Sequence, residues 1–304
     1  MFFTHRRKND LQVNLNEYID KYKEIVHQEL IRHLKQLDIP ESLKSSMLYS
    51  VEAGGKRLRP ILLIASYENY GSNIKKAMAP AIALELVHTY SLIHDDLPAM
   101  DNDDFRRGKP TNHKIFDEAT AILAGDALLT YSFEIIADDQ HLEDFEKVEL
   151  MKMLSKAAGP GGMVAGQIMD MEAENKPINL QQLETIHELK TGELLTFSVY
   201  AGAFLGRASD EEIRCLKEFA YYLGLIFQVQ DDILDVTGDP EKLGKSTGSD
   251  EDNKKSTYPN LLGLDGAKKH KEMYVQKAKK ALTKAKAENS YLMALTEHFS
   301  QRDH

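Results

Sequence analysis

The sequence predicts an all-α protein with a single domain, on three observations. Apolar residues recur with the i, i+3, i+4 spacing of amphipathic helices along most of the 304 residues. The apolar–polar alternation typical of strands is scarce, and no low-complexity linker or repeat of fixed period divides the chain. The helical segments are 15–37, 42–53, 60–70, 78–97, 117–138, 145–157, 180–206, 210–236, 259–264 and 266–287. They predict a bundle of about ten or more helices.

Glycine and proline lie where these helices are expected to stop. The breaks are Gly54-Gly55, Gly71, Gly108-Lys109-Pro110, Gly159-Pro160-Gly161-Gly162, Gly206 and Gly238-Asp239-Pro240. Pro60 suits the first position of the helix that follows the first break. Pro98 is expected to end or kink the fourth segment, because proline removes a backbone hydrogen bond.

Two segments lack helical spacing. Residues 1–13 begin with basic and polar sequence and predict a flexible N-terminal extension. Residues 237–259 are rich in Gly, Ser, Asp and Lys, and loops of that length within a domain are uncommon. They predict a lid over an active site, with a mobile surface loop as the alternative.

Composition excludes several classes of protein. The net charge of −10 argues against general binding of nucleic acid. Cys215 is the only cysteine, so an intramolecular disulfide is impossible and a reducing compartment is expected. We expect no signal peptide, because the basic N-terminus leads into polar sequence, and no membrane span. A cytoplasmic protein is predicted.

Two clusters of aspartate follow apolar helical sequence, at 83–94 and 221–230. Their members are Asp95, Asp96 and Asp101, with Asp103 and Asp104 beyond them, and Asp231, Asp232 and Asp235. Residues i and i+4 share a helix face, so the second cluster predicts a three-carboxylate group. Buried carboxylates need a cation, and oxygen ligands favour Mg²⁺, which usually completes its shell with water and substrate phosphates. A solvated acidic surface is the alternative, which the apolar flanks disfavour.

Positive charge gathers near these clusters despite the acidic composition. The cations are Lys56, Arg57 and Arg59 in a glycine turn, Arg106, Arg107 and Lys109 after the first cluster, and Lys245, Lys254 and Lys255 after the second. A helix N-terminus and arginine forks both suit phosphate. The alternative for the glycine turn is a solvated basic loop, and Lys190 alone is more typical of a surface lysine.

Two histidines allow a competing interpretation. Glu85-x-x-His88 and Glu184-x-x-His187 have the Glu-x-x-His spacing of di-iron bundles. That interpretation needs two further glutamates and leaves both aspartate clusters unexplained. His88 also lies seven residues before Asp95, on the same helix face, where it could bind a second phosphate group or be a satisfied core histidine.

These motifs together resemble the trans-isoprenyl diphosphate synthase family over nearly the whole chain, and within it the bacterial enzymes that make farnesyl diphosphate. The resemblance is carried by both aspartate clusters and by the segments Gly54–Pro60, His88–Asp96, Pro98-Ala99, Phe227–Asp232 and Lys255–Pro259. It implies an all-α bundle around a deep central cavity, usually a homodimer, that binds several Mg²⁺ ions, with Mn²⁺ as a substitute.

The resemblance also implies residue roles. Metal ions would be held by Asp95, Asp96, Asp101, Asp231 and Asp235. The allylic diphosphate would be gripped by Arg106, Lys190, Thr191, Gln228, Lys245 and Lys255, of which Arg106, Lys190 and Lys245 act in catalysis together with Asp231. Isopentenyl diphosphate would be held by Lys56, Arg59, His88 and Arg107.

The implied activity is condensation of isopentenyl diphosphate with dimethylallyl or geranyl diphosphate. Metal and lysines would stabilise charge on the leaving diphosphate, and positioning would favour attack on the allylic cation. Alternatives are a geranylgeranyl diphosphate synthase, a terpene cyclase and a non-catalytic synthase subunit. A cyclase needs only one diphosphate site, so the second basic set argues against it, and a non-catalytic subunit would be expected to lose aspartates.

Product length is predicted to depend on Tyr90 and Ser91, which precede Asp95. Ser91 lies one turn before Asp95 by helical spacing, whereas the resemblance places Tyr90 at the floor of the hydrocarbon cavity. We expect Tyr90→Ala and Tyr90→Ser to lengthen products beyond farnesyl, because the smaller side chain leaves room for another isoprene unit. Chromatography of the products tests this, and a variant that still makes farnesyl alone would refute the floor role.

Overall fold

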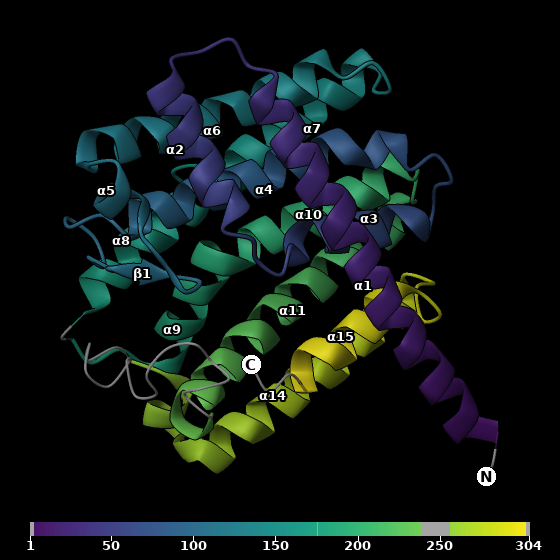
Figure 1. Cartoon of the computed structure of the whole chain (residues 1–304). Coiled ribbons are helices and arrows are strands. Elements are labelled where there is room, and N and C mark those ends of the chain that lie inside the picture. Colours follow the sequence, from purple (N-terminus) through teal and green to yellow (C-terminus); the bar gives the residue numbers. More distant parts are fainter. Residues whose placement is uncertain (1–2, 175, 239–255, 302–304) are drawn as a thin grey trace. The chain divides into compact units, whose positions relative to one another are not determined.

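Helices form nearly all of the regular structure in a computed structural model that describes residues 3–174, 176–238 and 256–301 (Figure 1). The prediction of an all-α fold is confirmed. The chain's residues group into two compact units. Unit 1 combines the residues up to Ile64 with Asn73–Met151, and unit 2 combines Ala65–Ser72 with the residues from Lys152 onward. The single domain stays a prediction.

Unit 1 is built around a pair of long helices, α4 and α6, which pack against each other. Its elements are α1 (Phe3–Lys35), α2 (Glu41–Glu52), the first part of α3 (Leu58–Glu68), α4 (Lys75–Asp95), β1 (Phe105–Arg106), β2 (Lys109–Pro110), α5 (Asn112–Ile115), α6 (Glu118–Asp138) and the first part of α7 (Asp144–Ala158). Helices α1 and α2 pack on this pair, and α4 is buried over most of its length.

Unit 2 is built around α11 and α14, which lie side by side (Figure 1). Its elements are the remaining parts of α3 and α7, α8 (Met163–Ala173), α9 (Leu180–His187), the π-helix η1 (Glu188–Gly192), α10 (Glu193–Leu205), α11 (Asp210–Thr237), α14 (Tyr258–Lys284) and α15 (Tyr291–Gln301). Large side chains from four of these helices, among them Phe197, Phe219, Tyr258 and Phe299, are fully buried in its core.

The structure corrects several predicted boundaries. Helix α1 begins at Phe3 rather than at residue 15. The prediction starts too late because the sequence before residue 15 is largely polar and lacks the apolar spacing of an amphipathic helix. Helix α3 begins at Leu58, so Pro60 lies within the first turn and not at its first position. The short helices α5 and α8 and the terminal α15 were not predicted. The predicted break near residue 265 is a kink at Gly263, whose φ of 71° is not helical.

The unpredicted strands β1 and β2 form a minimal antiparallel hairpin. Arg106 pairs with Lys109, which leaves Arg107 and Gly108 as a two-residue loop. Both loop residues have positive φ, 54° and 75°, as a type I′ turn requires. The predicted break at Gly108 is therefore a hairpin turn that presents two neighbouring arginines.

Helix α6 is long and apolar enough to cross a membrane by length and composition, so the expectation that no segment approaches a span is wrong for Glu118–Asp138. Such a helix also occurs in the core of globular proteins. Here α6 packs against α4 and α2, and it carries Asp126 and Glu134 within the segment.

Helix α11, which carries the second aspartate cluster, begins with a capping box. The Ser209 hydroxyl accepts from the Glu212 backbone N–H at 3.3 Å, and the Glu212 carboxylate accepts from the Ser209 N–H at 2.8 Å. Three acidic residues in the first turn suit the positive end of the helix dipole.

We expect Ser209→Ala to lower the free energy of unfolding by about 1 kcal/mol, because the first turn of α11 loses its side-chain acceptor. Urea denaturation followed by circular dichroism measures the change. Ser209→Asp is the matched control and should stay close to the parent protein, since aspartate also caps helices. Equal destabilisation by both substitutions would contradict the capping role.

Candidate active site

The first aspartate cluster lies at the C-terminal end of α4, in unit 1. Asp95 is the last residue of α4, and Asp96 is its C-cap. The chain then turns back, so that the Asp101 N–H donates to the Asp95 carbonyl at 2.9 Å. This turn brings Asp95 and Asp101 together although six residues separate them, a spacing that does not repeat on a helix. Both are half-buried, whereas Asp96 is buried.

Asp96 is paired with Arg106 of the hairpin. The Arg106 Nε donates to Asp96 Oδ1 at 2.6 Å, and Nη2 lies 2.5 Å from the same oxygen. Burial raises the pKa of the Asp96 carboxyl, and the hydrogen bond from Arg106 opposes that shift. The pair holds one Asp96 oxygen and orients the guanidinium. The metal-binding role of Asp96 stays a prediction that the second oxygen alone would have to fulfil.

The hairpin that carries Arg106 is anchored to α2 by buried polar contacts. The Asn112 side chain accepts from Ser46 Oγ at 2.8 Å and donates to Ser50 Oγ at 2.8 Å. Tyr49 donates to the Pro110 carbonyl at 2.7 Å. Because the chain is held in this way at the C-terminal end of β2, the hairpin that carries the two arginines is fixed to α2.

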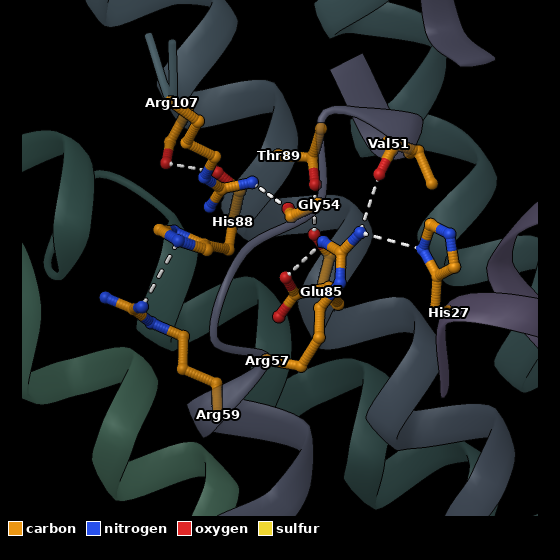
Figure 2. Close-up of polar contacts among 10 residues, drawn as sticks. His27, Val51, Gly54, Arg57, Arg59, Glu85, His88, Thr89 and Arg107 are labelled. Atoms are coloured by element: carbon orange, nitrogen blue, oxygen red, sulfur yellow. Dashed lines mark hydrogen bonds and ion pairs between the residues drawn. The ribbon is translucent and has the colours of Figure 1, made fainter. Parts of the chain in front are cut away.

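A cluster of cations surrounds His88, on α4, as Figure 2 shows. Arg59 Nη1 lies 3.3 Å from His88 Nε2, and Arg107 donates to the Gly54 carbonyl. Burial and four nearby arginines hold the pKa of His88 well below its usual value. His88 is therefore neutral at pH 7, so it accepts from Arg59 through Nε2 and retains a donor at Nδ1. Lys56 is exposed in the turn that precedes α3, the helix of Arg59.

Four of these residues were predicted to hold isopentenyl diphosphate. The structure brings Arg59 and His88 into contact, and it ties Arg107 to the turn that contains Lys56. A neutral histidine among arginines is a hydrogen-bonding group that adds no further positive charge. The set can therefore bind a diphosphate with its guanidinium and ammonium groups while His88 fixes geometry.

Tyr90 and Ser91, the predicted chain-length residues, lie one helical turn before the first cluster. Tyr90 is 7% exposed, and its ring packs edge-on against His94 with centroids 5.6 Å apart. Ser91 donates to the His88 carbonyl at 2.9 Å. An apolar aromatic face in the interior is compatible with a hydrocarbon stop, and the role stays a prediction.

Unit 2 contains a cavity of about 340 Å³ that brings together four predicted residues. Lys190 and Thr191 reach it from η1, and Gln228 and Asp231 reach it from α11. Thr191 donates to Gln228 at 3.1 Å, and Lys190 Nζ lies 2.7 Å from Asp170 Oδ2. Carboxylate, ammonium and hydroxyl groups on one wall are the chemistry that a metal-bound diphosphate needs.

The three-carboxylate group expected from the second cluster does not form. Asp232 accepts a hydrogen bond from the Tyr258 N–H at 2.8 Å and caps the start of α14. Asp231 and Asp232 both line the cavity, but one Asp232 oxygen is taken by this backbone hydrogen bond. Asp235 is 4% exposed, deeper along α11. Across residues 3–174, 176–238 and 256–301, no group of three or more His, Cys, Asp or Glu side chains is placed to bind a metal ion.

The aspartates of the two clusters fit Mg²⁺ only if water and a bound diphosphate supply the remaining ligands. Mg²⁺ is commonly bound by one or two carboxylates, with water and substrate phosphate completing six positions. Asp231 offers one carboxylate in the cavity of unit 2. In unit 1, Asp95 and Asp101 together offer two. The same observations exclude a di-iron centre from the described residues, because Glu85 pairs with Arg57 and Glu184 accepts from Tyr274.

Asp170, His187 and Thr257 also line the cavity. Sequence reasoning missed Asp170, considered His187 only as a di-iron ligand, and included Thr257 only within the segment Lys255–Pro259. Burial lowers the pKa of His187 to about 4, so its imidazole is neutral at pH 7. Asp170 lies on α8, a helix that was not predicted. One signal was available, since Asp170 is the single charged residue in the apolar segment 163–171. The predicted residues Lys245 and Lys255, Lys254, and most of the predicted lid lie outside the described residues.

The π-helix places Lys190 and Thr191. Sequence spacing predicted one helix over 180–206, but the chain widens at Glu188–Gly192 between α9 and α10. π-Segments of this kind often occur at functional sites. Helix α8 approaches η1 so closely that a Cβ at Gly166 would collide with the Lys190 backbone nitrogen. Glycine is therefore required for this contact.

Comparison with known proteins decides the family. The family model described as polyprenyl synthetase matches residues 40–295. The chain belongs to the polyprenyl synthetase family. It is 49% identical over 295 residues to the farnesyl diphosphate synthase of Geobacillus stearothermophilus, covering 96% of this chain and 99% of that protein.

Two further proteins are similar to this chain over most of its length. A chloroplastic geranylgeranyl pyrophosphate synthase of Catharanthus roseus is 47% identical over 267 residues, covering 87% of this chain and 75% of that protein. The crystal structure of the Helicobacter pylori geranyltransferase, complexed with magnesium and isoprenyl diphosphate, superposes with a TM-score of 0.78 at 37% identity, covering 92% of this chain and 95% of that one. The resemblance of the sequence to this family and its fold is confirmed.

We expect Gly166→Ala to lower the free energy of unfolding by about 1–3 kcal/mol, because the added methyl group overpacks the contact between α8 and η1. Gly161→Ala is the control, since a Cβ there meets no atom within 4 Å. Urea denaturation of both variants tests the contact. Equal stability of the two would show that η1 yields to the methyl group at no cost.

Proposed function

We propose that this polyprenyl synthetase condenses isopentenyl diphosphate with dimethylallyl and geranyl diphosphate to give (2E,6E)-farnesyl diphosphate and diphosphate. The observation that carries the proposal is 49% identity, over 96% of the chain, to an enzyme named for that product. The two sites support it, because unit 1 offers a basic set around His88, and unit 2 offers a cavity with both lysine and carboxylate.

The basic set Lys56, Arg59, His88 and Arg107 is the proposed site for isopentenyl diphosphate. Guanidinium groups bind phosphate oxygens in pairs and neutralise them without metal. Neutral His88 keeps Arg59 in place and has Nδ1–H left to donate. Holding the nucleophilic double bond in one orientation replaces a chance encounter with a positioned reaction.

The cavity of unit 2 is proposed to bind the allylic diphosphate, and Arg106 of unit 1 stays a predicted contact of that substrate. Lys190 donates to the leaving oxygens, Asp170 holds Lys190 in place, and Thr191 and Gln228 form one wall. Mg²⁺ ions held by the predicted ligands, which are Asp95, Asp96 and Asp101 in unit 1 and Asp231 and Asp235 in unit 2, would stabilise the charge that develops on the diphosphate. Lys245 and Lys255 are proposed to contact the same group.

A homodimer in the cytoplasm is proposed as the working form. Helices α5 and α6 contact each other and expose large apolar side chains, Ile115, Ile122 and Leu123, the last at 59%. Apolar residues that lie together on a surface are typical of interfaces between subunits. The single cysteine, Cys215, is free, which suits a reducing compartment.

A geranylgeranyl diphosphate synthase is the second candidate, because an enzyme of that name is nearly as similar. The two differ in product length, and therefore in the space below the first aspartate cluster. The buried Tyr90 favours the shorter product.

Incubation of the purified protein with isopentenyl and dimethylallyl diphosphates and Mg²⁺ tests the function. We expect farnesyl diphosphate by liquid chromatography with mass detection, and no product after the metal is chelated with EDTA. A product of twenty carbons would establish the second candidate. A cyclised hydrocarbon, or no product at any metal concentration, would refute the proposal.

A further inference from the structure

The turn that carries Lys56 and leads into α3, where Arg59 lies, has an unfavourable backbone. Gly54, Gly55 and Arg57 all have positive φ, of 84°, 128° and 51°. Glycine adopts this region readily, but for arginine it is disfavoured because Cβ approaches the following carbonyl. A non-glycine residue persists there only where its surroundings hold it. The side chain of Arg57 is therefore expected to be held firmly.

Arg57 is clamped inside unit 1 by groups from three helices (Figure 2). Its Nη1 donates to Glu85 of α4 at 2.7 Å, and both side chains are 1% exposed. Its Nη2 donates to the Val51 carbonyl of α2 at 2.6 Å and lies 3.4 Å from His27 Nδ1 of α1. The Arg57 carbonyl meanwhile accepts the Ile61 N–H, which opens α3.

The clamp connects directly to the predicted diphosphate-binding residues. Glu85 lies one turn before His88 on α4, and Arg57 lies two residues before Arg59. Fixing Arg57 on Glu85 therefore sets Arg59 opposite His88, where the 3.3 Å contact forms. The same turn presents the Gly54 carbonyl that accepts from Arg107. Neither Arg57 nor Glu85 belongs to the predicted binding set.

Glu85 also supplies the negative charge that this cluster needs. Arg57, Arg59 and Arg107 lie near one another around His88, and like charges in a partly buried site repel strongly. Burial lowers the pKa of Arg107, and Glu85 acts against that shift. The second oxygen of Glu85 is buried and has no hydrogen-bond partner among the described residues.

We propose that the buried Arg57–Glu85 ion pair positions the isopentenyl diphosphate site, by holding the left-handed turn and balancing the arginines that bind the substrate. Both are positioning residues, since neither reaches a substrate through the contacts described. The inference rests on the proposed function, because it concerns the affinity of one of its two substrates.

The experiment separates positioning from stability with a double variant. Removing one member of a buried ion pair leaves an unpaired charge, whereas replacing both by apolar residues of similar size often restores stability. We expect Arg57→Met and Glu85→Met each to lower the melting temperature. The double variant should recover most of it, yet keep a KM for isopentenyl diphosphate raised about tenfold or more, with the KM for geranyl diphosphate within about twofold.

Three further variants refine the result. Glu85→Gln keeps the shape and removes the charge, so it should raise the same KM, whereas Arg57→Lys should restore part of the affinity. Glu146→Gln is the control, because Glu146 is also fully buried and paired with Lys76 but lies outside the predicted site. It should lower the melting temperature and leave both KM values unchanged.

Two outcomes would overturn the inference: a double variant whose KM for isopentenyl diphosphate returns to the parent value, or single variants that raise both KM values equally. Calorimetric binding of isopentenyl diphosphate in EDTA gives a readout that needs no turnover. Parent protein that binds it but forms no product would refute the proposed function while leaving the inference testable. Binding that Arg57→Met does not weaken would refute the inference alone.

Discussion

Placing cations and carboxylates inside a helical protein requires that each charge meet a partner before any substrate arrives. In unit 1, Arg57 forms an ion pair with Glu85, and Arg106 forms one with Asp96. Both carboxylates are buried, Glu85 within α4 and Asp96 at its C-terminal end. In unit 2, Lys190 rests on Asp170. Burying an unpaired charge costs several kcal/mol or more of folding free energy. A charged side chain can therefore be buried near the site only where such a partner neutralises it.

The partners come from elements that are rigid for independent reasons. Helix α4 is buried over most of its length, and the hairpin is fastened to α2 through Asn112 and Tyr49. The π-segment η1 is pressed against α8 at Gly166. Positioning of reacting groups to within a fraction of an ångström depends on such support, because a flexible loop could not hold several charges in fixed directions.

The sequence predicts the fold class and most of the site residues, for reasons that particular elements make clear. The apolar spacing of 78–97 and 210–236 reports burial directly, and α4 and α11 follow it closely. Aspartates in such segments are conspicuous because burying them is costly. Lys190, Thr191, Gln228 and Asp231 were found in this way or through the family resemblance, and one cavity contains all four.

What was not predicted depends on tertiary contacts that leave little trace in a short window. Helix α8 has a glycine in its interior and few turns, so neither it nor Asp170 was expected. The role of Asp232 as a cap for α14 involves a residue 26 positions away. The pairing of Arg57 with Glu85 likewise joins two segments 28 residues apart, and sequence patterns cannot show which arginine of a basic turn faces inward.

The π-segment at Glu188–Gly192 has a consequence for how this chain tolerates change. A wide turn accommodates one residue more than an α-helix of the same rise. Deleting one residue there would leave a regular α-helix, so the backbone would not be strained. The side chains of α9 and α10 would keep their directions, because the wide turn already absorbs the extra residue. The residues within the segment, Lys190 and Thr191 among them, would change direction. Lys190 could then no longer share a wall with Gln228 and Asp231. Variation in length, more than variation in residue type, is what this stretch of the chain must avoid.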